Sequence, residues 1–414
     1  MVKQGYKQTE VGVIPEDWDV RKIGDFTDAT AGGTPSTSHP EYWNGEILWM
    51  SSGELNKRRI HNVIGRITEL GYNNSSTHMI PENCVLIGLA GQGKTRGTVA
   101  VNYVELCTNQ SIAAIFPSKE HNSEYLYQNL WSRYEELREL SSGDGGRGGL
   151  NLTIIKNFPC AFPKLQEQNR IAEALSDVDS MISSLEKLIA KKKAVKQGTM
   201  QELLTGKKRL PGFTGEWVSG KWKDVLGCFS SGATPYRGNS EFYKGTIKWV
   251  SSGELNYNYI TDTLEHISYD AQTITNLTLH PAGTFLMAIT GLEAAGTRGS
   301  CAILGTAATT TQSCMAIYGT EKMSTEYLFH YYVQNGDELA IQYCQGTKQQ
   351  SYTAAIVKEL PIYYPEDVAE QNVIASILSD MNKEIETLEQ KLAKNRQIKQ
   401  GMMQQLLTGK IRLV

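Results

Sequence analysis

The chain reads Lys196-Gln-Gly-Thr-Met-Gln-Glu-Leu-Leu-Thr-Gly-Lys207 and, about 200 residues later, Lys399-Gln-Gly-Met-Met-Gln-Gln-Leu-Leu-Thr-Gly-Lys410. Before both stretches, apolar residues recur in alternating steps of four and three, which places them on one stripe of an α-helix, as in a coiled coil. The stripe consists of Ile171, Leu175, Val178, Ile182, Leu185 and Ile189 in the first copy, and of Ile374, Leu378, Met381, Ile385, Leu388 and Leu392 in the second. The pattern predicts two helices of about 40 residues, or roughly 60 Å each.

Each predicted helix has a proline before its start and a glycine near its end. Pro163 and Pro365 precede the two helices, and Gly206 and Gly409 follow them, which is the usual asymmetry of start and stop signals. Because both helices belong to one chain, their simplest arrangement is an antiparallel coiled coil with each other. The alternative is that each helix packs on its own domain.

The duplication continues through the rest of the chain as short identical islands. The largest is Leu48-Trp-Met-Ser-Ser-Gly-Glu-Leu-Asn56, which recurs as Lys248-Trp-Val-Ser-Ser-Gly-Glu-Leu-Asn256. Smaller islands are Thr34-Pro35 with Thr234-Pro235, Thr95-Arg-Gly97 with Thr297-Arg-Gly299, and Gln110-Ser111 with Gln312-Ser313. A fixed long period indicates two copies of one structural unit. We therefore divide the chain into a globular domain at 1-162, a helix at 163-208, a second globular domain at 209-364 and a second helix at 365-414.

The globular domains are predicted to be mixed α/β. Short apolar runs bounded by Gly, Pro and Asn are typical of strands. They are Cys84-Val-Leu-Ile87, Thr98-Val-Ala-Val101, Ile112-Ala-Ala-Ile-Phe116 and Thr284-Phe-Leu-Met-Ala-Ile289. Residues 124–140 and 326–341 have a helical pattern. The predicted fold class is α/β, with mixed α+β domains, two long helices in an antiparallel coiled coil, and an internal pseudo-twofold duplication.

The composition is that of a loop-rich globular protein, with 40% hydrophobic residues, 21% charged residues and 38 glycines in 414 positions. No apolar run approaches the roughly 20 residues of a membrane span, and the first residues lack the apolar stretch of a signal peptide. We therefore expect a cytoplasmic protein. The net charge of -3 gives no global support for nucleic-acid binding, so any DNA affinity must come from local basic surface.

One stretch imitates a nucleotide-binding motif. Gly88-Leu-Ala-Gly-Gln-Gly-Lys-Thr95 satisfies the pattern of a phosphate-binding loop. Such a loop must open a helix, whereas the following residues, 96–104, are rich in β-branched side chains and predict a strand. The second copy, Gly291-Leu-Glu-Ala-Ala-Gly-Thr-Arg298, lacks the Gly-Lys pair. We therefore predict no ATPase activity.

Other catalytic and metal-binding signatures are missing from the sequence. The seven cysteines form no C-x-x-C pair and have no histidine at ligand spacing. No G-x-S-x-G elbow, H-E-x-x-H helix or G-x-G-x-x-G junction is present. The sequence therefore predicts a chain that is not an enzyme and that carries neither a metal nor a cofactor.

Two divergent domains that alternate with two near-identical helices resemble the specificity subunit of type I restriction-modification enzymes. The motifs that carry the resemblance are Ile155-Lys-Asn-Phe-Pro159 and Val357-Lys-Glu-Leu-Pro361, Glu167-Gln168 and Glu370-Gln371, and the paired Leu-Leu-Thr-Gly-Lys endings. The resemblance implies that each variable domain is a target-recognition domain, which reads one half of a bipartite target in double-stranded DNA. It also implies that the helices set the spacer and dock two methyltransferase subunits, and that restriction subunits join the full complex.

The candidate DNA contacts are polar side chains on glycine-rich loops, because Arg pairs with guanine edges and Gln or Asn pairs with adenine. The strongest pair is Arg96 and Arg298, each between Thr and Gly beside a strand end, and the alternative for both is a structural ion pair. The other candidates are Gln92, Lys94, Arg147, Lys57 and Arg58 in the first domain, and Arg237, Lys348 and Gln349 in the second. Lys57, Arg58 and Arg59 are candidates for phosphate contacts.

Three questions remain open at the level of sequence. The Ser-Ser-Gly-Glu-Leu-Asn segments are interpreted as scaffold, because they are identical in two domains that would read different sequences, although base contacts are the alternative. The first domain has the glycine-rich run Ser141-Ser-Gly-Asp-Gly-Gly-Arg-Gly-Gly149 where the second has the more family-like Gln345-Gly-Thr-Lys-Gln-Gln350. The alternative functions are a scaffold protein without DNA binding and the recognition subunit of a fused restriction-methylation system.

Overall fold

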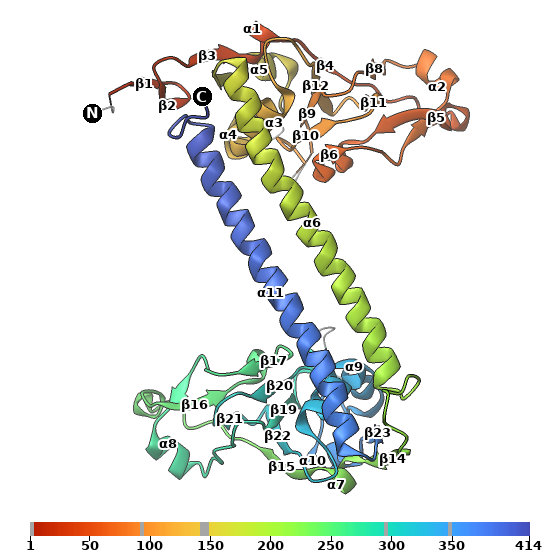
Figure 1. The fold of residues 1–414 in the computed structure, drawn as a ribbon, viewed down its shortest axis with the longest axis vertical. Helices are drawn as coiled ribbons and strands as arrows, with labels where there is room; N and C mark the ends of the chain where they lie inside the picture. Colours follow the sequence, from red (N-terminus) through yellow and green to blue (C-terminus); the bar gives the residue numbers. More distant parts are fainter. Residues whose placement is uncertain (1–3, 92–94, 141–148, 294–296, 347–349) are drawn as a thin grey trace. The chain divides into compact units, whose positions relative to one another are not determined.

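The computed structural model describes residues 4–91, 95–140, 149–293, 297–346 and 350–414. The chain forms two compact units: the first consists of Met1–Glu186 with Gln390–Val414, and the second of Lys187–Glu389. The long helices α6 (Leu165–Leu203) and α11 (Val368–Leu406) both cross the boundary between the units (Figure 1). Each unit therefore combines one globular domain with a segment of each long helix.

The main sheet of the first unit has the strand order β4 (Ala29–Ala31), β12 (Ile112–Ile115), β9 (Val85–Gly88), β10 (Val99–Asn102) and β6 (Arg59–Ile60). β6 runs parallel to β10, and the other neighbours are antiparallel. Every residue of β9, β10 and β12 is buried. Burial on both faces explains why these strands are continuous apolar runs rather than alternating ones.

A second sheet of this unit has the order β7 (Arg66–Ile67), β5 (Trp43–Met50), β11 (Leu106–Thr108) and β8 (Met79–Ile80). The strand pairs β1 (Tyr6–Thr9) with β2 (Gly12–Pro15), and β3 (Asp19–Lys22) with β13 (Pro159–Phe162), complete the strands described in the unit. The short helices are α1 (Ile23–Phe26), η1 (Pro40–Tyr42), η2 (Ser52–Lys57), α2 (Glu69–Asn73), α3 (Ser123–Ser132), α4 (Tyr134–Glu139) and α5 (Leu152–Lys156).

The second unit repeats this plan. Its main sheet has the order β15 (Gly227–Ser231), β22 (Cys314–Tyr318), β19 (Phe285–Ala288), β20 (Cys301–Leu304) and β17 (Asn258–Ile260). The other strands are β18 (His266–Ile267), β16 (Ile247–Val250) and β21 (Thr309–Thr310), and β14 (Trp217–Lys221) with β23 (Pro361–Pro365). The helices are α7 (Trp222–Val225), η3 (Ser240–Tyr243), η4 (Ser252–Glu254), α8 (Tyr269–Ile274), α9 (Thr325–Tyr343) and α10 (Ala354–Glu359).

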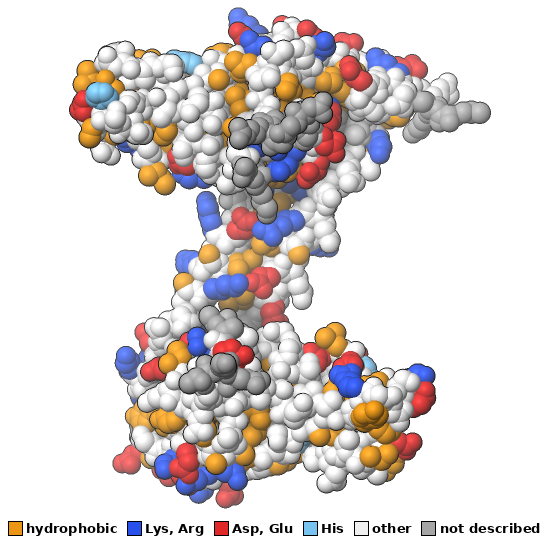
Figure 2. All heavy atoms as spheres, turned by 180° about the vertical axis from the view of Figure 1, so that it is seen from behind, with side chains coloured by type: hydrophobic (Ala, Val, Ile, Leu, Met, Phe, Trp, Pro, Cys, Tyr) orange, Lys and Arg blue, Asp and Glu red, His pale blue; other side chains and the backbone are white. Residues whose placement is uncertain are grey.

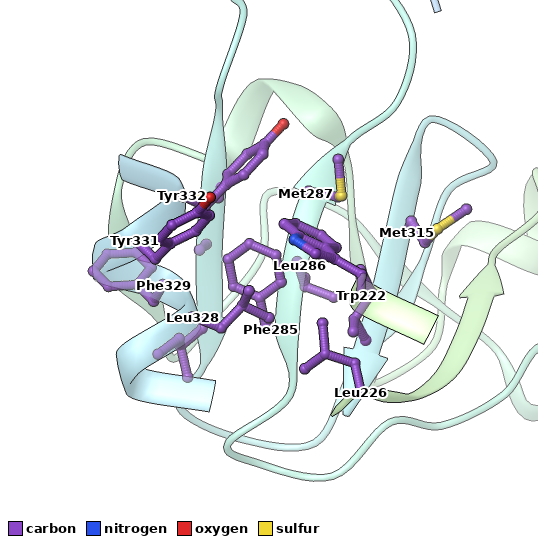
Figure 3. Packing of buried hydrophobic residues seen from close by; sticks show 14 of the residues in the cluster. Trp222, Leu226, Phe285, Leu286, Met287, Met315, Leu328, Phe329, Tyr331 and Tyr332 are labelled. Carbon is purple, nitrogen blue, oxygen red and sulfur yellow. The ribbon is translucent and has the colours of Figure 1, made fainter. Parts of the chain in front are cut away.

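Aromatic side chains fill the centre of the second unit. The Trp222 ring meets Phe285 of β19 and Tyr332 of α9 edge-on, with ring centroids 6.4 and 5.7 Å apart, and Phe285 lies 5.7 Å from Tyr332 (Figure 3). Edge-to-face contacts add to the stabilisation that burial of the rings already provides. This cluster holds α9 against β19 of the main sheet.

The predicted elements agree with the structure except for one helix. The strands expected at 84–87, 98–101, 112–116 and 284–289 are present to within one residue. The helix expected at 124–140 is wrong as a single element, because it breaks at Arg133 between α3 and α4. The Arg133 side chain donates to the Pro159 carbonyl, and its guanidinium lies 4.1 Å from the centroid of the Phe158 ring. These tertiary contacts override the local helical pattern, which continues unbroken in α9.

The long helices pair with each other in an antiparallel manner within each unit, as predicted. In the first unit Arg396 Nη2 lies 2.7 Å from Glu186 Oε1, and Lys399 Nζ lies 2.7 Å from Asp179 Oδ1. Higher residue numbers on α11 therefore lie opposite lower residue numbers on α6, as in an antiparallel pair. Lys192 with Glu384 and Lys193 with Glu389 pair at 2.7 Å in the second unit. The residues of the predicted stripe are all buried or half-buried.

Among the described residues, no helix combines the length and the apolar character that a membrane span needs.

The helices also contact the globular domains, so the alternative packing is realised in part. Ile171 and Leu175, near the start of α6, join a buried cluster with Trp18 and with Met403 and Leu406 from the end of α11. In the second unit, Met200, Leu203 and Leu204 from the end of α6 join the large core cluster that also contains Trp222 and Ile374. Each globular domain is thus sealed by the start of one long helix and the end of the other.

Candidate nucleic-acid interface

Loops from separate strands meet at one edge of the first unit. β5 ends at Met50, β9 at Gly88 and β11 at Thr108. Backbone hydrogen bonds join the segments that follow: Asn109 N donates to Met50 O at 3.0 Å, Leu89 N to Ser111 O at 2.8 Å, and Leu150 N to Leu89 O at 3.0 Å. The loops that carry Lys57, Arg58 and Arg96 are therefore neighbours. We call this edge, formed by residues 32–36, 51–58, 89–91, 95–98 and 109–111, the first reading edge.

The second unit has the corresponding edge. Thr311 N donates to Val250 O at 2.9 Å, Ile289 N to Ser313 O at 2.9 Å, and Tyr352 N to Ile289 O at 2.8 Å. We call this edge, formed by residues 232–237, 251–258, 289–293, 297–300 and 311–313, the second reading edge. The same backbone connections thus support loops of different sequence in the two units.

The repeated islands hold both edges together. The Thr34 hydroxyl donates to Gln110 Oε1, and in the second unit the Thr234 hydroxyl donates to Gln312 Oε1. The indole N–H of Trp49 donates to the carbonyl of Gly33 at 3.0 Å. Islands that lie far apart in sequence are therefore identical in both copies because they contact each other.

The Ser-Ser-Gly-Glu-Leu-Asn segment directs its Glu and Leu side chains inward in both units, while Asn56 and Asn256 are exposed. Glu254 Oε2 accepts from the backbone N–H of Ser251 at 2.9 Å, and its Oε1 accepts from that of Leu264 at 2.8 Å. Glu54 Oε1 accepts from the backbone N–H of Ile64 at 3.1 Å in the equivalent way. Leu55 and Leu255 are buried. These contacts favour the scaffold interpretation of the segment over direct base contacts.

Half of the candidate DNA contacts lie outside the described residues. They are Gln92, Lys94, Arg147, Lys348 and Gln349. The described residues after the Gly88–Thr95 motif form a turn and then β10, so the predicted strand is confirmed. β9 and β10 are antiparallel neighbours, whereas a phosphate-binding loop opens a helix.

Arg96 and Arg298 occupy equivalent turns. Gly97 and Gly299 end these turns with φ of 79° and 75°, a conformation that favours glycine, which explains the repeated Thr-Arg-Gly island. Arg96 is half-buried. Arg298 Nε lies 2.9 Å from Asp337 Oδ1, and the arginine side chain is 19% exposed. Arg298 therefore has a carboxylate partner within its own unit, and its base contact stays a prediction.

Arg237 is also engaged within its own unit. Its two terminal nitrogens donate to Glu265 at 2.6 and 2.8 Å, and its guanidinium lies 4.4 Å from the centroid of the Tyr243 ring. These hydrogen bonds lower the pKa of Glu265. Both partners are substantially exposed, so the pair adds little stability and leaves Arg237 close to the second reading edge.

The cations that follow the first Ser-Ser-Gly-Glu-Leu-Asn segment differ in their partners. Lys57 Nζ lies 2.7 Å from Glu54 Oε1. Arg58 is exposed, and its guanidinium lies 3.8 Å from the centroid of the Trp131 ring. Arg58 and Trp131 line a groove of about 1030 Å3 in the first unit, together with Lys399 of α11.

One buried charge cluster was missed by sequence reasoning. Asp179 of α6 accepts from Arg59 at 3.0 Å, from Gln128 at 2.8 Å and from Lys399 at 2.7 Å. Arg59 also donates to Glu124 at 3.0 Å. Burial lowers the pKa of Lys399, while Asp179 opposes this shift. The cluster joins β6, α3, α6 and α11, and no spacing rule connects residues so distant in sequence.

Charge is mixed over the visible surface. On the face shown in Figure 2, Lys and Arg side chains are interspersed with Asp and Glu side chains in both units. Within the described ranges, no group of three or more His, Cys, Asp or Glu side chains could hold a metal ion. The face in view therefore carries no broad basic patch.

Duplicated α/β units with equivalent loop-bearing edges, each combined with segments of two long helices, define a protein of two related halves. The sequence matches the family described as "Type I restriction modification DNA specificity domain" twice, over residues 15–197 and 214–399. The chain belongs to this family, and both matches include one globular domain with its following helix.

Individual relatives are named as specificity subunits of type I restriction enzymes. The chain is 34% identical over 187 residues to the type I restriction enzyme MjaIX specificity subunit of Methanocaldococcus jannaschii, a match that covers 44% of this chain and 42% of that protein. It is 23% identical over 430 residues to the MjaVIII specificity subunit of the same organism, covering 99% of this chain and 97% of that protein. The first match therefore spans less than half the length of the relative, and the second spans nearly all of it.

Solved structures share the fold. The type I restriction-modification S subunit from M. genitalium superimposes with a TM-score of 0.62 at 14% identity, and the alignment covers 94% of this chain and 96% of that one. The overlap includes both globular domains and both helices. At this identity the likeness establishes the fold alone.

Proposed function

We propose that this chain is the DNA-reading specificity subunit of a type I restriction-modification complex, and that each reading edge binds one half of a bipartite target in double-stranded DNA. The observation that carries the proposal is the pairing of Thr34 with Gln110 and of Thr234 with Gln312. The same internal scaffold supports loops of different sequence in the two units. Two readers of different half-sites need this combination, because base contacts specify while the framework only positions them.

The helix pair sets the number of unspecified base pairs between the half-sites and docks two methyltransferase subunits, and restriction subunits join the full complex. Support comes from the near identity of the helices and from their equivalent ion pairs, Arg396 with Glu186 and Lys193 with Glu389. Equivalent surfaces suit two copies of one partner. Methylation and cleavage, with their cofactors, are the work of these partners, and the proposed location is the cytoplasm.

The proposal retains the sequence-based division into target-recognition domains at 1-162 and 209-364 and spacer helices at 163-208 and 365-414. Its candidate DNA contacts are Gln92, Lys94, Arg96, Arg147, Lys57, Arg58, Arg237, Arg298, Lys348 and Gln349. Arg237 and Arg298 must exchange their intramolecular carboxylate partners for DNA if they read bases.

Methylation-site sequencing in cells that carry this chain with its methyltransferase partner tests the function. The expected result is methylation confined to a motif of two short specified blocks around an unspecified spacer. Electrophoretic shift with the purified complex at fixed salt should show preference for that duplex over a random one. Equal affinity for both duplexes, with no methylated motif, would favour a scaffold protein.

An insertion tests the role of the helices. Four residues added within Leu185–Ile189, with a matching insertion in α11, lengthen each helix by about 6 Å and a little more than one turn. At 3.4 Å per base pair along each strand, and with the helix pair inclined to the DNA, the spacer should grow by roughly 1–2 base pairs. The bases within each block should stay the same. An active variant with the original spacer would refute this role.

A further inference from the structure

Both units place a strained, non-glycine residue just after the shared Ser-Ser-Gly-Glu-Leu-Asn segment, as the second residue after it in the first unit and the first residue after it in the second. Arg58 has a φ of 62°, and Tyr257 has a φ of 57°. This region is costly for residues with a Cβ atom, and Arg58 combines it with a ψ of -45°, outside the ordinary left-handed well. The strained position differs by one residue between the two copies, so the strain belongs to the loop rather than to one aligned residue. Such outliers cluster at functional sites.

The surrounding scaffold imposes this conformation. The backbone N–H of Arg58 donates to Leu55 O at 3.0 Å, and that of Tyr257 donates to Cys301 O at 2.9 Å. Leu55 is fully buried, so the loop is anchored in the core on its inner side. The strained side chains are left exposed on the outer side. An internally fixed loop thus presents a different exposed side chain in each unit.

Both side chains lie beside the Thr-Arg-Gly turn of their own unit. The Tyr257 hydroxyl lies within 3.4 Å of the main-chain oxygen of Arg298, to which it donates. Arg58 lines a groove together with Thr98, the residue that follows the equivalent turn in the first unit. The exposed residue and the turn therefore form one continuous part of each reading edge.

Arg58 keeps its hydrogen-bonding capacity available. Its neighbours Lys57 and Arg59 are both committed to carboxylates. Within the part of the chain that the structure describes, the guanidinium of Arg58 has no hydrogen-bond acceptor and contacts the Trp131 ring at 3.8 Å. Stacking on an aromatic face fixes the plane of a guanidinium and reduces the entropy it loses on binding. A planar, preoriented fork with open donors matches the O6 and N7 acceptors of guanine.

We propose that Arg58 and Tyr257 are specificity-determining residues, each reading a base in one half-site. Arg58 donates to a guanine edge, and Trp131 acts as its positioning residue. Tyr257 lacks a guanidinium group. It contacts a base either through its hydroxyl or by packing its ring against a thymine methyl group. A phosphate contact would carry no sequence information, so it would weaken all sequences equally. This inference rests on the proposed DNA-reading function.

The test uses the complex with its methyltransferase partner, with methylation-site sequencing and competition binding as readouts. Arg58→Ala should lower discrimination at one position of one half-site by about 5-fold to 150-fold, the range of a bidentate base contact, and leave the other half-site unchanged. Tyr257→Ala should affect only the other half-site. Lys119→Ala, which removes an exposed cation from the loop before α3, should change neither.

Conservative variants separate a base contact from other roles. Arg58→Lys keeps the charge but loses the fork, so it should lose discrimination while the salt dependence of binding stays the same. Trp131→Phe should retain specificity that Trp131→Ala loses. The inference is overturned if Arg58→Ala weakens all sequences equally, which marks a phosphate contact, or changes nothing. If the unaltered complex selects no bipartite sequence, the proposed function itself fails, and this inference fails with it.

Discussion

Arg412 and Glu167, 245 positions apart in the chain, form a two-pronged ion pair. Arg412 Nε lies 2.7 Å from Glu167 Oε1, and its Nη2 lies 2.9 Å from Oε2. The second unit repeats the pair with Arg209 and Glu370 at 2.9 and 2.8 Å. The arginine after each Leu-Leu-Thr-Gly-Lys ending thus meets the glutamate of a Glu-Gln motif near the start of the other long helix. The two recurring motifs therefore contact each other and hold the end of one long helix against the start of the other.

Removing either arginine should destabilise its own unit. The Glu167 and Glu370 side chains are 5% and 1% exposed, so Arg412→Ala or Arg209→Ala leaves a buried carboxylate with too few donors. The expected loss is roughly 3 kcal/mol in the free energy of unfolding. Denaturant unfolding measures it. Lysine at either position should restore only part of the stability, because it cannot make two parallel hydrogen bonds to the carboxylate. Full stability in the alanine variants would show that this ion pair is dispensable.

Glycines of the long helices and their ends should respond oppositely to alanine. At Gly198, inside α6, an added Cβ meets no atom within 4 Å, so Gly198→Ala should stabilise by about 0.5–1 kcal/mol. Gly206 has a φ of 68°, and its Cβ would lie 3.0 Å from Trp217 Cδ2. Gly206→Ala should therefore cost roughly 1–2 kcal/mol. Thermal unfolding of both variants checks the contrast, which an equal shift in Tm would contradict.

The Asp179 cluster predicts a difference between the units. Asp179→Asn leaves Lys399, whose side chain is 9% exposed, without its ion pair, and should cost roughly 2–4 kcal/mol. The repeat aligns Asp179 with Asn382 and Lys399 with Lys196. The matched variant Asn382→Asp should be neutral or slightly stabilising, because it adds a carboxylate opposite a cation. Chemical unfolding of both variants tests this, and equal losses would argue against the cluster.

Buried histidines should make stability sensitive to acid. Burial, with a smaller effect of Lys196, lowers the pKa of His330 from 6.5 to about 4. Between these values the unfolded chain holds a proton that the folded chain does not, so stability is fully present above pH 6.5 and falls toward pH 4. The contribution is roughly 3 kcal/mol at most.

His330→Gln removes this contribution while a side-chain amide remains to contact Ser379, as Nε2 of the histidine does at 2.9 Å. Glutamine is also the residue that the first copy has at the equivalent position, Gln128. Unfolding measured at pH 7.5 and pH 4.5 should show a smaller acid loss in the variant. Identical losses would mean that His330 is not the titrating group.

The long helices could be predicted because their pattern is local. Apolar residues recur every three or four positions from Ile171 to Ile189, and the same spacing in the second copy supports a helical period. The break at Arg133 could not be predicted in the same way. It depends on Phe158 and Pro159, which come from a later strand and loop.

The sequence could predict which segments of the reading edges recur, but not which residues of those segments contact each other. The sequence shows that Thr34 and Gln110 recur, and the structure shows that they touch. The Asp179 cluster gave no signal at all, because its partner Arg59 is replaced by Tyr259 in the second copy and comparison of the copies therefore hides it. The candidate Arg298 was identified from the repeated Thr-Arg-Gly island beside a strand end, and a local pattern of this kind does not register Asp337, 39 positions away.

The division of the chain into units has a consequence for the order in which the protein matures. On the ribosome, all of Lys187–Glu389 is made before Gln390–Val414 becomes available to complete the first unit. Until then, Trp18 and Ile171 lack Met403 and Leu406, the neighbours that cover them. Domains usually fold in the order of their synthesis. Here all residues of the second unit are synthesised before the last residues of the first. The first unit therefore keeps apolar surface accessible to chaperones until the end of α11 has been made.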